Sequence, residues 1–349
     1  MTINNQTPET MWRRYAATFL ATAEDVGLAK EDIDTCLSYA KKLLLQGIPP
    51  VYDLNHFSSI VGYDPSYVTG AAAATTKYYR RFTIPKKSGG EREIAEPLPS
   101  LKEIQRWVLD NILRNIPIHP AAKAYAAGLS IKDNARFHRS QNVVLTIDIK
   151  DFFPSINSGR VYNVFRRTGF SKHVSAMFTD LCCLSKTLPQ GAPTSAHLSN
   201  VILQPLDARC FGLARSRDIR YTRYADDLTF SGDFNPAPFK EIIYSILANF
   251  GFEPNLDKTR VFSRANRQLV TGIVVNEKMQ VPRSDRRKLR QEAYYIKKYG
   301  IDSHIVKTGI KQHNYVGHLI GKAGFTRFVN PYDRDALMML ETLLWHKLK

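Results

Sequence analysis

Apolar and polar positions follow a helical period over the first 50 residues. In "ETMWRRYAATFLATAEDVG" and "EDIDTCLSYAKKLLLQG" the apolar residues lie three and four apart, and Gly27 and Gly47 follow the last periodic position of each. Apolar positions at this spacing form one face of a helix, and glycine is common just past a helix end. We therefore expect two helices, within an N-terminal helical extension over residues 1–75 that packs without chemistry of its own.

The pattern then changes to short β-rich runs around a Ser-Gly-Gly turn, in "YYRRFTIPKKSGGEREIAEP". This spacing predicts a hairpin. Its basic residues are Arg80, Arg81, Lys86, Lys87 and Arg92. They could hold phosphates, or they could protect an exposed sheet edge from pairing. The following "SLKEIQRWVLDNILRNI" predicts an amphipathic helix that Ser100 caps and Glu103 completes as a capping box.

A buried strand is predicted by "NVVLTIDIKDFF", which is apolar from Val143 to Ile149 except for Thr146 and Asp148. An ionised carboxylate on a buried strand is costly unless it is paired or binds a metal. Further along, "IRYTRYA" and "LTFSG" predict two strands joined by a two-residue loop of Asp226 and Asp227. An acidic pair in such a loop is by itself most often an ordinary turn.

The charged Asp148 on a buried strand and the acidic pair in the loop together point to a metal site. If strand 143–149 lies beside the hairpin 221–231, Asp148 and Asp226 converge on one point. Carboxylate oxygens without a suitable Cys/His set favour Mg²⁺ over zinc. Two such ions about 4 Å apart can activate an attacking hydroxyl and stabilise the leaving oxygen of a phosphoryl transfer. The pattern therefore favours nucleotidyl transfer.

The charge of the chain supports a polyanionic partner. The 349 residues carry 49 Lys and Arg against 32 Asp and Glu, a net charge of +17. Nucleic acid and anionic membranes are the common partners of such a surface. No apolar run approaches the roughly 18 residues that cross a bilayer, and the polar start has no signal core, so we expect a cytoplasmic protein. The length of the chain predicts two or three subdomains.

The C-terminal part concentrates this charge. Residues 283–327 hold 11 Lys and Arg against 3 Asp and Glu, interleaved with tyrosine and phenylalanine. Cations that meet phosphates and rings that stack on bases suit a nucleic-acid track. A solvated helical face is the alternative.

Several motifs in order resemble the reverse transcriptases. Asp148 in "DIKDFF", then "LPQGAPTSAHLSN", "YADD", "GFEPNLDKT" and "VTGIVV" resemble the palm motifs, and "RFTIPKKSGGEREI" resembles the fingers; the match covers about residues 75 to 345. The resemblance implies an α+β right-hand polymerase with an antiparallel palm sheet. Its fingers and palm would span residues 76–275, and a basic helical thumb would span residues 276–349.

The resemblance also implies catalytic roles. Asp148 and Asp226 match the metal-binding carboxylates, and Asp227 matches a third whose coordination is often less direct. Ile149 matches a position whose carbonyl completes the coordination of the two Mg²⁺ ions. Lys258 matches the lysine that protonates the pyrophosphate leaving group, although an exposed lysine after a turn is an alternative interpretation.

Further positions match the nucleotide site. Phe153 matches the aromatic that collides with a ribose 2′-hydroxyl, which implies dNTP substrates. Gln190 and Gly191 match the turn that packs against the incoming nucleotide and template. Arg92 and Lys86 are candidates for binding the triphosphate.

Within the family, the chain is most similar to bacterial retron reverse transcriptases. Asn134 and His138 fit their NAxxH element, and Val270, Thr271 and Gly272 fit their VTG element. Both are candidate RNA-recognition sites, with a structural role as the alternative. Asn134 and His138 would share a helix face at this spacing.

Membership of this group implies a particular set of partners. They are a structured noncoding RNA that is both template and primer, dNTPs, and the DNA product. Synthesis would start from the 2′-hydroxyl of an internal guanosine and give branched RNA–DNA, often in an antiphage system with a separate effector protein. Two other hypotheses are a diversity-generating or abortive-infection reverse transcriptase, and a non-catalytic RNA-binding scaffold. The scaffold is disfavoured because all three aspartates are present.

Overall fold

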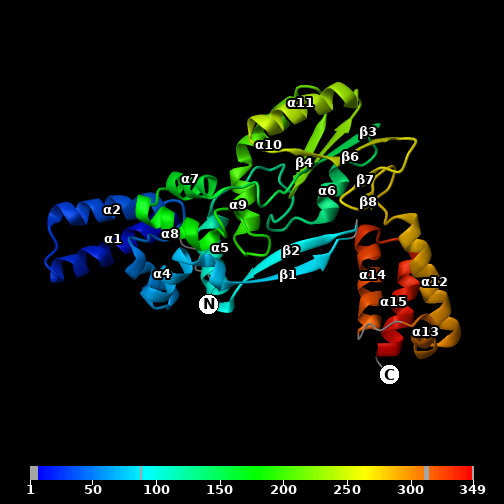
Figure 1. The fold of residues 1–349 in the computed structure, drawn as a ribbon, viewed down its shortest axis with the longest axis horizontal. Coiled ribbons are helices and arrows are strands. Elements are labelled where there is room, and N and C mark those ends of the chain that lie inside the picture. The colour runs from blue at the N-terminus through cyan, green and yellow to red at the C-terminus, as the bar shows by residue number, and fades with distance from the viewer. Residues whose placement is uncertain (1–6, 87–88, 310–313, 348–349) are drawn as a thin grey trace. The chain divides into compact units, whose positions relative to one another are not determined.

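The computed structural model describes residues 7–86, 89–309 and 314–347 (Figure 1). It divides into two compact units. The first comprises Met1–Ala126, Ile149–Ala208 and Leu247–Glu253, and the second comprises Ala127–Asp148, Arg209–Ile246 and Pro254–Lys349. Lys87 of the predicted hairpin turn lies outside the described residues.

The first unit begins with four helices: α1 (Pro8–Asp25), α2 (Lys30–Leu44), α3 (Leu54–Val61) and α4 (Pro65–Ala73). The first two confirm the helices predicted from the apolar spacing, and they pack against each other. In α2 the buried side chains are Ile33, Ala40, Leu43 and Leu44, which form the expected apolar face.

The basic hairpin is confirmed. Strands β1 (Tyr79–Pro85) and β2 (Glu91–Pro97) pair antiparallel, with Tyr79 opposite Pro97. Helix α5 (Pro99–Asn111) follows at once, and its N-cap residue is Leu98, which makes no side-chain cap. The predicted Ser100 cap is therefore wrong, because the helix starts at Pro99, two residues before the start that a Ser100 cap implies; the fixed φ and missing N–H of proline suit the first helical position.

The other helices of the first unit are α7 (Ser158–Thr168), α8 (Lys172–Cys182) and α9 (Ser195–Ile202). Aromatic side chains form much of its core. Phe178 of α8 meets the ring of Phe57 at 5.1 Å and that of Phe170 at 5.2 Å, both edge to face. Buried Gln105 of α5 donates to the hydroxyl of Tyr79, which ties the base of the hairpin to this core.

A four-stranded sheet forms the centre of the second unit, in the order β4-β5-β3-β6. The strands are β3 (Val143–Ile149), β4 (Arg220–Tyr224), β5 (Asp227–Gly232) and β6 (Pro254–Ser263). The β3–β5 and β4–β5 pairings are antiparallel, as the predicted palm sheet requires. Helix α6 (Ile131–Phe137) packs on β4, and α10 (Gln204–Arg215) and α11 (Pro236–Asn249) flank the hairpin in sequence.

The C-terminal segment of the second unit is mostly helical, as the sequence predicts, and its helices pack into a bundle. After the short strands β7 (Leu269–Val270) and β8 (Ile273–Val274) come α12 (Arg283–Tyr299), α13 (Ile301–Thr308), α14 (Tyr315–Val329) and α15 (Arg334–Lys347). Leu289, Leu319 and Met339 are buried in the core that α12, α14 and α15 share.

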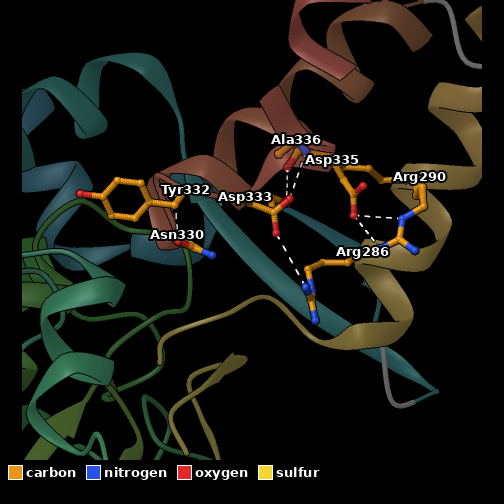
Figure 2. Close-up of polar contacts among 9 residues, drawn as sticks. Arg286, Arg290, Asn330, Tyr332, Asp333, Asp335 and Ala336 are labelled. Carbon is orange, nitrogen blue, oxygen red and sulfur yellow. Dashed lines mark hydrogen bonds and ion pairs between the residues drawn. The ribbon is translucent and has the colours of Figure 1, made fainter. Parts of the chain in front are cut away.

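Two ion pairs join α12 to the start of α15 (Figure 2). Arg290 binds Asp335 through both Nε and Nη2, at 3.0 and 2.7 Å, and Arg286 lies 3.9 Å from buried Asp333. Asp333 also caps α15 by accepting from the backbone N–H of Ala336. Among the described residues, none of the helices combines the length and apolar character that crossing a membrane requires.

Candidate active site and nucleic-acid interface

The predicted convergence of acidic residues is present in the second unit. In the β3–β5 ladder Asp148 lies directly opposite Asp227, and β5 also pairs with β4 so that Tyr224 faces Asp227. The two loop residues are therefore Ala225 and Asp226. The predicted loop of Asp226 and Asp227 is wrong by one position, because Asp227 already belongs to the ladder.

The turn that carries Asp226 has an uncommon backbone. Ala225 has a φ of +57°, and of the two loop residues it alone has positive φ, the pattern of a type II′ turn. Glycine is usual there, and a non-glycine residue in this region costs about 1–2 kcal/mol. The Nη1 of Arg223 donates to the carbonyl oxygen of Ala225 at 3.0 Å and helps to hold the turn. The sequence reasoning missed this fully buried arginine, although a charged residue inside a strand was a signal of the same kind as Asp148.

Lys258 lies on β6 at the acidic site. Its Nζ is 2.9 Å from Oδ1 and 3.2 Å from Oδ2 of Asp148. The Lys258 side chain is about half exposed, whereas that of Asp148 is mostly covered. The ammonium group of Lys258 thus forms an ion pair with Asp148, a carboxylate that is predicted to bind a metal ion.

The electrostatics of the site suit a divalent cation. Burial, and then the charges of Asp226 and Asp148, raise the pKa of Asp227 to about 8. Carboxylates crowded in this way repel one another, and a cation bound among them would relieve the repulsion. No three acidic, histidine or cysteine side chains of the described residues form a ready-made metal cage. This is compatible with Mg²⁺, which usually binds through one or two carboxylates, waters and substrate phosphates.

Asn134 and His138 lie in the protein interior, on and just after α6 as their spacing predicts. The Oγ1 of Thr222 on β4 donates to Oδ1 of Asn134 at 2.6 Å and lies 2.7 Å from Nε2 of His138. Nδ1 of His138 lies 2.7 Å from the hydroxyl of Ser231 on β5. Both side chains are therefore bound to the strands that carry the acidic turn, which supports the structural alternative over direct RNA contact.

The VTG element is connected to the same network. Thr271 and Gly272 form the tip between β7 and β8, both with positive φ, and Asn134 Nδ2 lies 3.4 Å from the hydroxyl of Thr271. Val270 is fully buried, and it packs in one cluster with Ala135 of α6. Of the VTG residues only Gly272 is exposed.

The remaining predicted site residues lie in the first unit, and among them Ile149 is buried and directly follows Asp148 in sequence. Phe153 is half-buried and meets Phe152 edge to face. Arg92 and Lys86 are exposed on and beside the basic hairpin.

Gln190 and Gly191 form a close contact with β2. The backbone N–H of Ala95 donates to the carbonyl oxygen of Gln190 at 2.9 Å. Gly191 has a φ of +132°, and a Cβ there would lie 2.6 Å from the carbonyl oxygen of Ala95. Only glycine fits at this position, so the predicted turn is built against the fingers-like hairpin.

Exposed aromatics accompany the basic residues of the helical bundle. Phe328 on α14 is 44% exposed, and Lys132 Nζ lies 5.3 Å from the centre of its ring. Tyr332, in the loop before α15, is 90% exposed, and Figure 2 shows its ring directed away from the ion pairs of Arg286 and Arg290. A turn made by Asn330, which accepts from the Tyr332 N–H, holds this loop. The sequence reasoning did not single out Tyr332.

Known proteins match the chain over most of its length. The family model described as "Reverse transcriptase (RNA-dependent DNA polymerase)" matches residues 84–317. The retron Ec86 reverse transcriptase of Escherichia coli is 37% identical over 223 residues, which cover 62% of this chain and 70% of the relative. The retron Mx65 reverse transcriptase of Myxococcus xanthus is 36% identical over 287 residues, which cover 75% of this chain and 64% of the relative.

A third relative, the retron Mx162 reverse transcriptase of Myxococcus xanthus, is 36% identical over 260 residues, 64% of this chain and 54% of the relative. The chain thus spans 54% to 70% of the length of these three relatives. Among solved structures, a telomerase from Candida albicans has a TM-score of 0.47 at 10% identity, over 83% of this chain and 67% of its own.

The family model covers the end of β1, all of β2, the whole four-stranded sheet and the start of α14. The resemblance inferred from the motifs is therefore confirmed, and with it the α+β fold of a right-hand polymerase. The chain belongs to the reverse transcriptase family and, within it, to the retron reverse transcriptases.

Proposed function

We propose that the chain is an RNA-directed DNA polymerase of the cytoplasm that copies a structured noncoding RNA. The same RNA serves as primer through the 2′-hydroxyl of an internal guanosine, so that the product is branched RNA–DNA (msDNA). The observation that carries the proposal is the register of β3 and β5, which sets Asp148 opposite Asp227 beside the turn of Asp226. The names of the matched relatives support the retron assignment over the two other bacterial types.

The acidic residues would hold two Mg²⁺ ions. Asp148 and Asp226 would act as direct ligands, Asp227 would act less directly, and the carbonyl of Ile149 would complete the set. When bound, the two ions activate the attacking hydroxyl and stabilise the leaving oxygen. Lys258 gives a proton to the departing pyrophosphate, as a general acid at this position does.

The other predicted residues select and hold the substrates. The ring of Phe153 excludes a ribose 2′-hydroxyl and so favours dNTPs, while Gln190 and Gly191 pack against the incoming nucleotide. Arg92 and Lys86 bind the triphosphate. The helices from α12 to α15 form the thumb, whose cations and exposed rings grip the template–primer duplex. Because phosphate contacts release counterions, this binding weakens steeply with salt.

The proposed function extends to phage defence. As a retron enzyme the chain would act with a separate effector protein, and its RNA–DNA product would be part of the system. The NAxxH and VTG elements contribute to RNA recognition indirectly. Because Asn134 and His138 are buried, these elements act through the shape that they give to the base of the thumb.

The proposal is tested by purifying the protein with its bound nucleic acid and treating portions with RNase and DNase. We expect a small species that contains a branched nucleotide and that RNase and DNase each shorten only in part. Heterogeneous RNA without attached DNA contradicts the proposal. In parallel, Asp226→Asn should abolish dNTP incorporation and leave RNA binding intact, whereas Asp233→Asn, at an exposed position after β5, should incorporate normally.

A further inference from the structure

A cavity of about 630 Å³ lies between α12, α13 and α14 of the C-terminal bundle. This volume falls within the roughly 300–1,000 Å³ of small-ligand pockets. All its lining residues belong to the second unit. None of them takes part in the proposed catalysis.

Nearly parallel rings line the cavity. Tyr295 is stacked on Tyr299, with centroids 6.2 Å apart and planes 23° apart, and on His304 at 6.2 Å and 15°. His304 is stacked in turn on Tyr315 at 5.8 Å, and its Nε2 lies 3.1 Å from the Tyr315 hydroxyl. The side chain of Tyr299 is 52% exposed. Lys298 Nζ lies 5.2 Å from the centre of the Tyr299 ring. A run of nearly parallel rings that is partly open to solvent suits the stacking of another planar ring.

The carboxylate of Glu292 lines the same cavity and needs hydrogen-bond donors. Its Oε1 lies 3.7 Å from Lys322 Nζ, whereas its Oε2 is buried and has no hydrogen-bond partner among the described residues. The charge of Glu292 is close enough to add to the burial that raises the pKa of Tyr315 to about 12. A buried carboxylate oxygen without a donor is costly, so turning this side chain toward a ligand that brings donors into the cavity would be favourable.

Cations border the same cavity. Lys288 lies one helical turn before Glu292 on α12, and Lys307 lies on α13; both are exposed and line the pocket. Stacking rings, an acceptor-only carboxylate and flanking ammonium groups together match the base and the phosphates of one nucleotide.

We propose that this pocket takes one unpaired guanine of the RNA that the enzyme binds, an assignment that rests on RNA binding in the proposed function. The Watson–Crick edge of guanine presents two neighbouring donors, N1–H and the 2-amino group, which match the two oxygens of a carboxylate. The corresponding edges of adenine, cytosine and uracil set an acceptor beside the donor, and that acceptor would face Glu292. The guanine ring stacks on the exposed ring of Tyr299 beside Tyr295, and the phosphates of that nucleotide face Lys288 and Lys307.

The test measures the anisotropy of 5′-labelled RNA pentamers with the full chain. We expect UUGUU to bind on the order of tenfold more tightly than UUUUU or than the pentamer with inosine, which lacks the 2-amino group, because one bidentate base contact discriminates by about this factor. Glu292→Gln should remove the preference, whereas Glu341→Gln, an exposed carboxylate on α15, should retain it. Tyr299→Phe should keep the affinity and Tyr299→Ala should lose it, with thermal unfolding showing that each variant is folded.

Equal binding of the three pentamers by the wild-type chain, or an unchanged preference in Glu292→Gln, overturns the assignment. Tight binding of free GMP that RNA does not displace would assign the pocket to a free nucleotide and would also overturn it. DNA synthesis on poly(rA) primed with oligo(dT) tests the proposed polymerase separately, because this template contains no guanine. A wild-type chain that prefers guanine but makes no DNA therefore counts against the proposed function alone.

Discussion

The ammonium group of Lys258 on β6 binds both carboxylate oxygens of Asp148 on β3, at 2.9 and 3.2 Å. Without nucleotide, Lys258 and a divalent cation compete for Asp148. We expect Lys258→Gln to bind Mg²⁺ a few-fold more tightly, as isothermal titration calorimetry would measure. Its nucleotide incorporation should fall by about 10²-fold or more, because a general acid contributes about that factor.

Lys258→Arg separates these two effects. It keeps the positive charge beside Asp148 but cannot give up a proton readily, since the pKa of arginine exceeds 12. We expect an affinity for Mg²⁺ close to that of the wild type, together with slow incorporation. Fast incorporation by the arginine variant would contradict the proton-transfer role.

The affinity for Mg²⁺ should depend on pH through Asp227. Burial and the neighbouring charges of Asp226 and Asp148 raise its pKa to about 8, so below this pH the metal-free carboxyl holds a proton. Binding of the cation displaces that proton, and the dissociation constant should fall by up to about tenfold per unit as pH rises from 6.5 to 8. Asp227→Asn should flatten this dependence.

The same carboxyl affects stability. Between its ordinary pKa of 3.8 and its raised value of about 8, the folded chain binds a proton that the unfolded chain has lost. The free energy of unfolding without metal should therefore decrease as pH rises through this window. Saturating Mg²⁺ should reduce the decrease. Urea titrations at pH 5, 6.5 and 8 with and without Mg²⁺ measure both effects.

Phe153 should control the choice of sugar. Truncation in Phe153→Ala removes the ring proposed to collide with a 2′-hydroxyl, and single-turnover assays should then show faster ATP incorporation while dATP incorporation changes less. The half-buried ring contacts Phe152, so Phe153→Tyr, which keeps the ring, is the matched control. Unchanged discrimination in the alanine variant would assign the selection to another residue.

Thr222 should stabilise the fold through Asn134 and His138. Because Thr222 donates to Oδ1 of Asn134, its oxygen accepts from Nε2–H of His138, whose Nδ1 lies 2.7 Å from the hydroxyl of Ser231. Thr222→Val removes the shared hydroxyl from this buried network. Each group left without a partner costs about 1–3 kcal/mol, which denaturant titration would detect. Thr83→Val, at an exposed position on β1, should change little.

Gly191 should tolerate no side chain. An added Cβ lies 2.6 Å from the carbonyl oxygen of Ala95, and the φ of +132° is itself unfavourable for alanine. We expect Gly191→Ala to raise the KM for dNTPs and to lose stability by about 1–3 kcal/mol. Gly212→Ala is the control, since this glycine lies within α10 with no atom within 4 Å of the added Cβ. There the substitution should be neutral or stabilising.

Local sequence pattern predicted many of the elements and singled out the acidic residues. The period of apolar positions predicted α1 and α2, and the β-rich runs predicted the β1–β2 hairpin. Asp148 was conspicuous because a charge on an apolar strand needs a partner. These features depend on neighbouring residues, which is why they can be read from the chain itself.

Tertiary structure decided what depends on segments distant in sequence. The pairing of β4 with β5 places the turn at Ala225 and Asp226, one residue from its predicted position. The position of β6 in the sheet brings Lys258 to Asp148. Packing of α6 on β4 buried Asn134, and packing of α13 against α12 and α14 formed the cavity of the C-terminal bundle. Strand register and burial are set by the pairing of whole surfaces, so no local pattern along the chain contains them.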